Sequence, residues 1–229
     1  MSDWDGEYER AGVPSSFRDA PSAAVVWALE NWARLGGSGV PARGLDVGCG
    51  TARNSAFLAR HGTRMLGFDA SPVAIERGRE RVRAGGVGTD AVELLVHDLQ
   101  DGLPAGDGEI DLVLDTFVYK HQLQPAARER YRAELARVLA PGGRILISLA
   151  EPDDGYYGAC PPSPEPGAGP HAIVDPEVGA GSVLFTLAEL EAELSDRFAL
   201  EMAWRKQKPG TMHGRTYLRR TLATLWRAA

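Results

Sequence analysis

The sequence predicts an α/β fold in which seven strands form a mostly parallel sheet, with helices on both faces and an antiparallel hairpin at its end. Between residues 43 and 150, short apolar runs alternate with segments of helical period, which is typical of a parallel sheet with right-handed crossovers. Beyond residue 186, a helical segment precedes two strand-like runs joined across Pro209 and Gly210, which indicates the terminal hairpin.

The elements follow one another regularly as far as residue 150. The first helix is expected over residues 22–35, where apolar residues recur at helical spacing and stop at Gly36 and Gly37. Apolar runs then predict strands at residues 43–49, 64–70, 92–98, 109–118 and 144–150. The segments between them predict helices at residues 51–62, 71–84 and 125–140. Ser71 and Pro72 suit the N-cap and the first position of the second of these helices.

The chain is expected to fold as a single domain with four parts. The first 20 residues are polar and aromatic and suggest an irregular arm, while residues 151–182 are rich in proline and glycine and show no period. An irregular segment of that length in a compact domain is usually functional, so we interpret it as a substrate lid. The parts are an arm with a helix over the pocket, a binding core, the lid, and a C-terminal helix with a strand pair, at residues 1–36, 37–150, 151–183 and 184–229.

The charge distribution bears on possible partners. A net charge of -6 argues against a dedicated nucleic-acid binder, which is usually basic. Seven Lys or Arg residues and no acid follow Glu201, however. Such a basic tail suits either an anionic substrate or RNA, or simply a solvated strand pair. We therefore treat a nucleic-acid partner as a less favoured interpretation.

Cysteine usage and hydropathy indicate the compartment. Cys49 and Cys160 are too few for a disulfide framework or a zinc cluster. The N-terminal residues contain no apolar segment of the signal-peptide kind, and no apolar run approaches the ~18 residues of a membrane span. We expect a cytoplasmic protein that does not enter a membrane, and the sequence leaves its oligomeric state open.

The stretch "GLDVGCGTARNS", residues 44–55, joins the first predicted strand to the next helix through a glycine turn. In open parallel sheets the ligand binds beyond the carboxyl ends of the strands, where this turn lies. Gly48 and Gly50 allow a ligand to approach the backbone, and the helix N-terminus suits a carboxylate or phosphate. Arg53 stands where a dinucleotide fingerprint has its third glycine and would obstruct a pyrophosphate. The turn therefore favours a smaller ligand with one carboxylate.

Acidic residues follow the next two predicted strands. Asp69 ends the second strand, 23 residues after Asp46, the place and spacing of an acid that binds ribose hydroxyls. Asp98 ends the third strand, where it would reach an adenine edge. Cys49 invites interpretation as a nucleophile, but a small buried residue within the turn is the stronger interpretation.

Five segments in order, "LDVGCGTA", "GFDAS", "HDL", "DLVLDTF" and "LAPGGRILIS", resemble the motifs of class I S-adenosylmethionine-dependent methyltransferases over roughly residues 43–150. The resemblance implies a Rossmann-like fold, S-adenosylmethionine as cofactor and S-adenosylhomocysteine as product. The stretch "GTARNSAFLARHG" resembles the subgroup that acts on small molecules or chalcogen compounds, including tellurite-resistance and thiopurine-type enzymes, and Ala52 departs from the usual glycine. The implied cofactor-binding residues are Asp46, Gly48, Cys49, Gly50, Asn54, Asp69, Ala70, Asp98, Leu99, Asp115 and Thr116.

The resemblance also implies separate places for these groups. Asp46 and the glycine turn would hold the amino-acid end of the cofactor, and Asp69 its ribose. Asp98 and Leu99 would flank the adenine. Asp115 and Thr116 would lie beside the methionine portion and face the methyl acceptor.

The candidate catalytic residues are Tyr119, Lys120 and His121, in "DTFVYKHQ" at the carboxyl end of the fourth predicted strand. His121 is expected to titrate near neutral pH and to take a proton from a hydroxyl, thiol or amine, although a packing role is an open alternative. Lys120 is as readily interpreted as a solvent-facing residue, and Tyr119 as part of the pocket wall.

The candidate substrate-binding residues come from three other segments. Tyr156 and Tyr157 in the lid would supply flat apolar walls with polar tips. His213, in the turn region of the hairpin, would overhang the pocket from the opposite rim, and Tyr8 and Phe17 would fold over it from the arm. We expect no metal, because no Asp-Asn pair follows the fifth strand.

Three hypotheses follow for function. The first is a methyltransferase acting on an O, N or S atom of a small molecule. The second is an RNA or protein methyltransferase, supported by the basic tail but lacking the motif of base-amino methylation after the fourth strand, where "DTFV" stands. The third keeps the fold and the cofactor without methyl transfer, since fold does not fix function.

Overall fold

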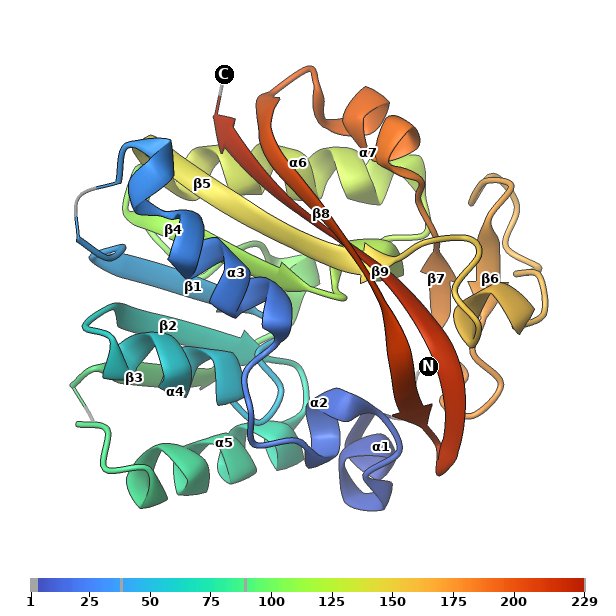
Figure 1. The fold of residues 1–229 in the computed structure, drawn as a ribbon, viewed down its shortest axis with the longest axis horizontal. Helices are drawn as coiled ribbons and strands as arrows, with labels where there is room; N and C mark the ends of the chain where they lie inside the picture. The colour runs from blue at the N-terminus through green and yellow to red at the C-terminus, as the bar shows by residue number, and fades with distance from the viewer. Residues whose placement is uncertain (1–3, 38, 89, 229) are drawn as a thin grey trace.

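The computed structural model describes residues 4–37, 39–88 and 90–228. Its central sheet has the strand order β3-β2-β1-β4-β5-β9-β8, and Figure 1 shows the strands running through the middle of the molecule. No helix within the described ranges is long and apolar enough to cross a membrane. The seven strands are β1 Arg43–Val47, β2 Arg64–Asp69, β3 Val92–Val96, β4 Ile110–Thr116, β5 Leu139–Ala150, β8 Phe198–Met212 and β9 Arg215–Ala228.

The first five strands pair in parallel, and β9 pairs antiparallel with both β5 and β8. Strand β1 lies between β2 and β4, so the chain order reverses across it. Such a switch point opens a crevice at the carboxyl ends of the strands, where open α/β sheets bind ligands. The predicted α/β fold with a seven-stranded mostly parallel sheet is therefore confirmed.

Helices cover both faces of the sheet (Figure 1), and the sheet separates the apolar core into two clusters. One face is packed by α3 Ala23–Asn31, α4 Arg53–Arg60 and α5 Pro72–Ala84. The other face is packed by α6 Pro125–Val138 and α7 Leu187–Leu194. In β4 the side chains alternate between the faces, because successive residues of a strand point to opposite sides.

The helix boundaries follow local chemistry. Ser71 caps α5 by accepting a hydrogen bond from the Ala74 amide at 3.1 Å, with Pro72 at the first helical position as predicted. Thr186 and Glu189 form a reciprocal capping box at the start of α7. These side chains satisfy amides that the first turn of a helix otherwise leaves unpaired.

The hairpin turn lies at His213 and Gly214, so the prediction that the strands join across Pro209 and Gly210 is wrong. His213 has a φ of 46° and Gly214 a φ of 74°, the two left-handed positions that a two-residue hairpin turn requires. Pro209 is instead paired with Leu218 within the ladder. A proline is tolerated there because β8 is the edge strand of the sheet.

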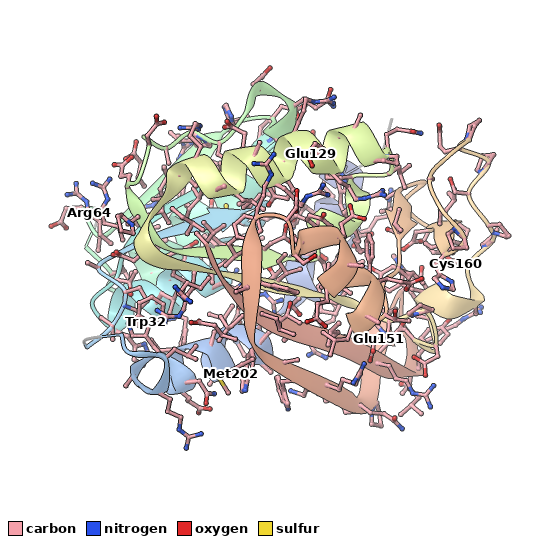
Figure 2. The ribbon with its side chains drawn as sticks, turned by 90° about the horizontal axis from the view of Figure 1, so that it is seen from above. Trp32, Arg64, Glu129, Glu151, Cys160 and Met202 are labelled. Carbon is pink, nitrogen blue, oxygen red and sulfur yellow. The ribbon has the colours of Figure 1, made fainter. Side chains whose placement is uncertain are left out.

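Two segments expected to be irregular contain regular structure. The arm forms two short helices, α1 Trp4–Arg10 and α2 Pro14–Phe17, because tertiary packing buries apolar side chains such as Tyr8 and Val13. The lid segment holds the 3-10 turn η4 Tyr157–Ala159 and a small antiparallel sheet of β6 Ala172–Val174 and β7 Gly181–Val183. In Figure 2, Cys160 of this segment and Arg64 of β2 lie at opposite ends of the molecule.

Candidate active site

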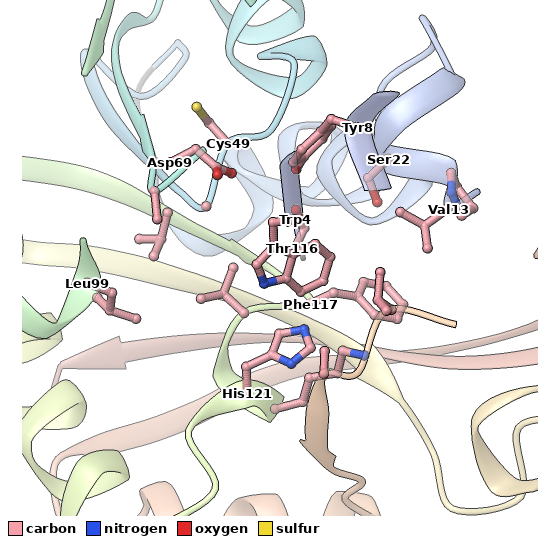
Figure 3. A pocket seen from close by; sticks show the side chains of 18 of the residues that line it. Trp4, Tyr8, Val13, Ser22, Cys49, Asp69, Leu99, Thr116, Phe117 and His121 are labelled. Atoms are coloured by element: carbon pink, nitrogen blue, oxygen red, sulfur yellow. The ribbon is translucent and has the colours of Figure 1, made fainter. Parts of the chain in front are cut away.

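A cavity of about 270 Å³ lies at the carboxyl ends of β1, β2 and β4. Figure 3 shows it from close by, with Asp69 and Tyr8 on one side, His121 on the opposite side, and Trp4 and Thr116 between them. The arm, the glycine turn, the strand ends, the lid and the hairpin all contribute to its wall. Twelve of the predicted site residues line it, namely Tyr8, Gly48, Cys49, Asn54, Asp69, Ala70, Asp98, Leu99, Thr116, Lys120, His121 and Tyr157.

The glycine turn is closely covered by neighbouring side chains. Gly48 and Gly50 have φ values of 56° and 55°, which favour glycine. A Cβ atom at Gly50 would lie 2.7 Å from the Tyr8 hydroxyl oxygen, so this position has to stay without a side chain. Gly50 itself is not among the cavity-lining residues. Burial raises the pKa of the Cys49 thiol, which agrees with its interpretation as a small buried residue of the turn.

Asp69 connects the glycine turn to the next helix. One carboxylate oxygen accepts the Gly50 amide at 2.9 Å, and the other accepts the Ser71 amide at 2.9 Å. Burial raises the pKa of Asp69, while the hydrogen bonds from Ser71, Gly50 and the Tyr8 hydroxyl oppose that shift. A carboxylate offers about four acceptor positions, so it retains capacity for a further donor.

Two further groups are fixed by local hydrogen bonds. Asp98 caps the 3-10 turn η2 Leu99–Asp101 by accepting the Gln100 amide at 2.9 Å. Asn54 accepts the Ser22 amide at 2.8 Å and donates to the Thr116 hydroxyl at 3.3 Å. Asn54 therefore joins the start of α3, the start of α4 and the end of β4 at the cavity.

Asp46 lies beneath the turn and does not line the cavity. Its Oδ2 accepts the Ser55 hydroxyl at 2.6 Å, and its Oδ1 has no hydrogen-bond partner among the described residues. Burial raises the pKa of Asp46 to about 7, against the opposing effect of the Ser55 hydrogen bond. The structure thus places Asp46 as a support of the turn, out of reach of direct contact with a ligand in the cavity.

Asp115 does not face the cavity either, in contrast to the place that the resemblance implied. It is fully buried and accepts the amides of Val118 and Tyr119, each at 3.0 Å, and the Tyr131 hydroxyl at 2.8 Å. Burial raises the pKa of Asp115 to about 6. Its carboxyl group holds the turn that leads from β4 into η3 Tyr119–His121, and so positions Lys120 and His121.

The structure does not support Tyr119 as a catalytic residue. Its side chain is fully buried in the core on the α6 and α7 side of the sheet, and it is absent from the cavity wall. The Tyr119 hydroxyl donates to Glu193 at 3.1 Å, and burial raises its pKa. The sequence placed three polar groups in a row, but a 3-10 turn directs adjacent side chains to different sides.

His121 lines the cavity, with the edge of the Trp4 ring against it at a centroid distance of 5.3 Å. Its Nδ1 atom lies 2.7 Å from the Gly181 carbonyl oxygen. Burial, together with the nearby Lys120 charge, lowers the pKa of His121 to about 3. The imidazole is therefore neutral at physiological pH, and the expectation that it titrates near neutrality is wrong.

This burial predicts a pH-dependent contribution of His121 to stability. The folded-state pKa lies below the unfolded value of ~6.5, so the contribution is fully present above that pH and is lost as pH falls toward about 3. We expect wild type to lose up to ~1.4 kcal/mol per pH unit relative to His121→Asn over this window. Urea unfolding of both proteins checks it, and a pH-independent difference between them would contradict it.

Lys120 is buried, in contrast to the solvent-facing alternative, with 1% of its surface exposed. Its Nζ lies 3.7 Å from the centre of the Tyr157 ring and 5.5 Å from that of Phe117. Burial lowers the pKa of Lys120 to about 7; Asp175 opposes this shift and Arg219 adds to it. Lys120 is therefore able to exchange a proton near neutral pH.

Sequence reasoning missed several residues of the wall, among them Phe117, Asp175 and Arg219. Arg219 is 9% exposed and its Nε lies 2.9 Å from an Asp154 oxygen. In the sequence it is one of many basic residues in the C-terminal run, and no local pattern distinguishes it. A position facing inward from β9 at the level of the cavity is visible only in the folded chain.

Three predicted substrate-binding residues lie outside the wall. Phe17 is 39% exposed. Tyr156 stands behind Tyr157 and donates to Asp175 at 2.8 Å. His213 donates its backbone amide to the Gly12 carbonyl at 2.8 Å, which ties the hairpin tip to the arm. The last two therefore support the wall without forming it.

Known proteins resemble this chain in domain, sequence and fold. Residues 45–143 match the family model described as a methyltransferase domain. An uncharacterised methyltransferase from Synechocystis sp. is 35% identical over 130 residues, which cover 56% of this chain and 55% of that protein. A probable chloroplastic tocopherol O-methyltransferase from Oryza sativa subsp. japonica is 39% identical over 104 residues, covering 45% of this chain and 27% of that protein. The chain thus spans about half, or less, of the length of these curated relatives.

Solved structures extend the likeness to the whole fold. The 1,6-didemethyltoxoflavin-N1-methyltransferase of Burkholderia thailandensis superposes with a TM-score of 0.70 at 22% identity, covering 99% of this chain and 86% of that chain. The narrower resemblance to tellurite-resistance and thiopurine-type enzymes receives no specific support and stays a prediction. With the ordered motifs, the matched domain and the shared fold together, the chain is similar to the S-adenosylmethionine-dependent methyltransferases.

Proposed function

We propose that the chain transfers the methyl group of S-adenosylmethionine to an O, N or S atom of a small-molecule acceptor. The observation that carries this is a single cavity with two kinds of wall. One end is formed by the glycine turn and the strand-end acids, and the other by Lys120, His121 and aromatic side chains. A donor and an acceptor bound in these two ends would lie next to each other.

The residues at the first end fit the cofactor. Gly48 presents its backbone to the cavity, and Asp69 keeps acceptor capacity for a ribose hydroxyl. Asp98 and Leu99 stand at the adenine end, and Asn54 and Thr116 at the methionine end. When bound, the cofactor supplies a methyl group on an electrophilic sulfonium, so the protein mainly has to orient the acceptor and exclude water.

The enclosure of the cavity supports a small acceptor. The arm covers it with Trp4 and Tyr8, and the hairpin with Met212. Two relatives are named for small molecules, a tocopherol O-methyltransferase and a demethylmenaquinone methyltransferase. The basic run on the hairpin is largely neutralised by four ion pairs, Arg205–Glu151, Arg219–Asp154, Arg220–Asp153 and Arg227–Glu201, which argues against a nucleic-acid surface. Cys49 and Cys160 are both free, in keeping with the cytoplasmic location that forms part of this proposal.

Proton removal from the acceptor is assigned to Lys120, since His121 is too weak a base. We expect kcat/KM to fall as pH drops below about 7, because the protonated amine no longer accepts a proton. Lys120→Met should lose this step and about a hundredfold in rate. The pH profiles of methyl transfer by both proteins measure this. An unchanged acid limb in the variant would remove Lys120 from the role.

The function itself is tested with methyl-labelled S-adenosylmethionine, the protein and a cell extract. Label recovered among small molecules supports the proposal, and mass spectrometry of that fraction then gives the acceptor. Label in RNA or protein would favour the second hypothesis. A protein that binds the cofactor but labels nothing across extracts would favour a non-methylating role.

A further inference from the structure

Two basic side chains each lie against the Tyr157 ring at the acceptor end of the cavity. The Lys120 Nζ lies 3.7 Å from the centre of the Tyr157 ring, and the Arg219 guanidinium carbon lies 5.1 Å from it. Both cations belong to the cavity wall, and both are at least nine-tenths buried. Arg219 is ion-paired with Asp154, so a second positive charge on Lys120 is unfavourable unless a further anion accompanies it.

The guanidinium of Arg219 is held by one edge only. Its Nε donates to both oxygens of Asp154, at 3.0 and 2.9 Å. The terminal nitrogens Nη1 and Nη2 have no hydrogen-bond partner among the residues that the structure describes. Arg219 is thus fixed in orientation while its forked end, which matches an oxyanion, stays available.

Two nearby carboxylates are hydrogen-bonded to the protein, Asp154 through both oxygens and Asp175 through one. Asp154 also accepts hydrogen bonds from the amides of Tyr156, Tyr157 and Arg220, so both of its oxygens are occupied by donors of the protein. One oxygen of Asp175 accepts the Tyr156 hydroxyl at 2.8 Å and the Glu177 amide at 3.0 Å.

The Lys120 amino group forms no ion pair with a carboxylate among the described residues. Within the described ranges, its Nζ has no hydrogen-bond partner and lies near the rings of Phe117 and Tyr157. Those rings offer flat apolar surface beside the two cations.

We propose that the methyl acceptor is a flat ring compound with an acidic hydroxyl group, and that Lys120 and Arg219 hold its oxygen as an oxyanion. This inference rests on the proposed function and narrows its acceptor. The hydroxyl proton passes to the Lys120 amine, and the resulting ammonium and the Arg219 fork flank the oxygen. The ring lies against Tyr157 and Phe117. A carboxylate on a ring compound would bind the two cations in the same way. The experiment therefore has to distinguish an acidic hydroxyl from a carboxylate.

Binding to the S-adenosylhomocysteine-loaded protein tests this without turnover. The probes are 4-nitrophenol with 4-nitroanisole, and 4-nitrobenzoate with 4-nitrobenzamide, each pair differing in one ionisable group. We expect 4-nitrophenol to bind at least tenfold more tightly than 4-nitroanisole, and to show phenolate absorbance at a pH where the free probe is protonated. If the natural acceptor carries a carboxylate, the preference for 4-nitrobenzoate over 4-nitrobenzamide should be the larger of the two preferences.

Variants assign the effect to the two cations. Lys120→Met and Arg219→Gln should each abolish the preference for the anion, whereas binding of S-adenosylhomocysteine stays within twofold. Lys206→Met is the matched control, since Lys206 also lies over an aromatic ring, that of Trp204, but outside the cavity. The inference would be overturned if the neutral and ionisable members of each pair bind equally, or if the anion preference survives in both variants. It would also be overturned if no probe binds at ~10 mM. If the wild-type protein does not bind S-adenosylhomocysteine, that result counts against the proposed function instead.

Discussion

Asp69→Ala is expected to weaken the binding of S-adenosylhomocysteine about a hundredfold, a loss of ~2.7 kcal/mol. The Asp69 carboxylate stands at the end of β2 and lines the cavity. It would lose a charge-assisted hydrogen bond to a ribose hydroxyl, worth ~1.5–3 kcal/mol. Titration calorimetry with S-adenosylhomocysteine measures the change directly.

Two further variants separate ligand binding from support of the turn. Asp69 also accepts the amides of Gly50 and Ser71, so its removal loosens the glycine turn. Asp69→Asn retains an amide oxygen for one of these bonds and should lose about tenfold in affinity. Asp101→Ala is the control, because Asp101 is exposed and lies outside the cavity. Wild-type affinity in Asp69→Ala would refute the ribose assignment.

Asp115→Ala is expected to lower the free energy of unfolding by ~3–5 kcal/mol, the largest stability effect at the site. The variant leaves the Val118 and Tyr119 amides and the Tyr131 hydroxyl buried without their acceptor. Each orphaned group costs ~1–3 kcal/mol. Urea unfolding measures the change.

The comparison with Asp111→Ala calibrates this result. Asp111 accepts a single exposed hydrogen bond, from the Arg43 amide at 2.8 Å, so its loss should cost ~1 kcal/mol or less. The folded fraction of Asp115→Ala should bind S-adenosylhomocysteine within tenfold of wild type. A hundredfold loss of affinity with unchanged stability would return Asp115 to the methionine-binding role that the resemblance implied.

The sequence predicted the parallel core and the cofactor end of the cavity because both depend on local patterns. Strand and helix periods repeat between residues 43 and 150, and glycines at positions 48 and 50 indicate a turn with left-handed backbone conformation and closely approaching neighbours. Asp69 and Asp98 follow from the same pattern, since the carboxyl ends of parallel strands meet at one edge. Those residues line the cavity where the pattern placed them.

Tertiary structure alone decided the acceptor end. Tyr119, Lys120 and His121 are adjacent in sequence, yet one joins the core, one lies on the Tyr157 ring and one faces Trp4. Their titration behaviour depends on burial by segments that are distant in the chain, so Lys120 rather than His121 exchanges a proton near neutral pH.

Long-range packing also selected the remaining wall residues. Arg219 reaches the cavity because β9 pairs with β5 and Asp154 holds its Nε, a contact across 65 residues. Such pairs obey no sequence period, whereas strands, caps and glycine turns do. The sequence by itself therefore determined the fold and where the cofactor is expected to bind, and the folded chain determined which side chains meet the acceptor, because burial and charge pairing there arise from contacts between distant segments.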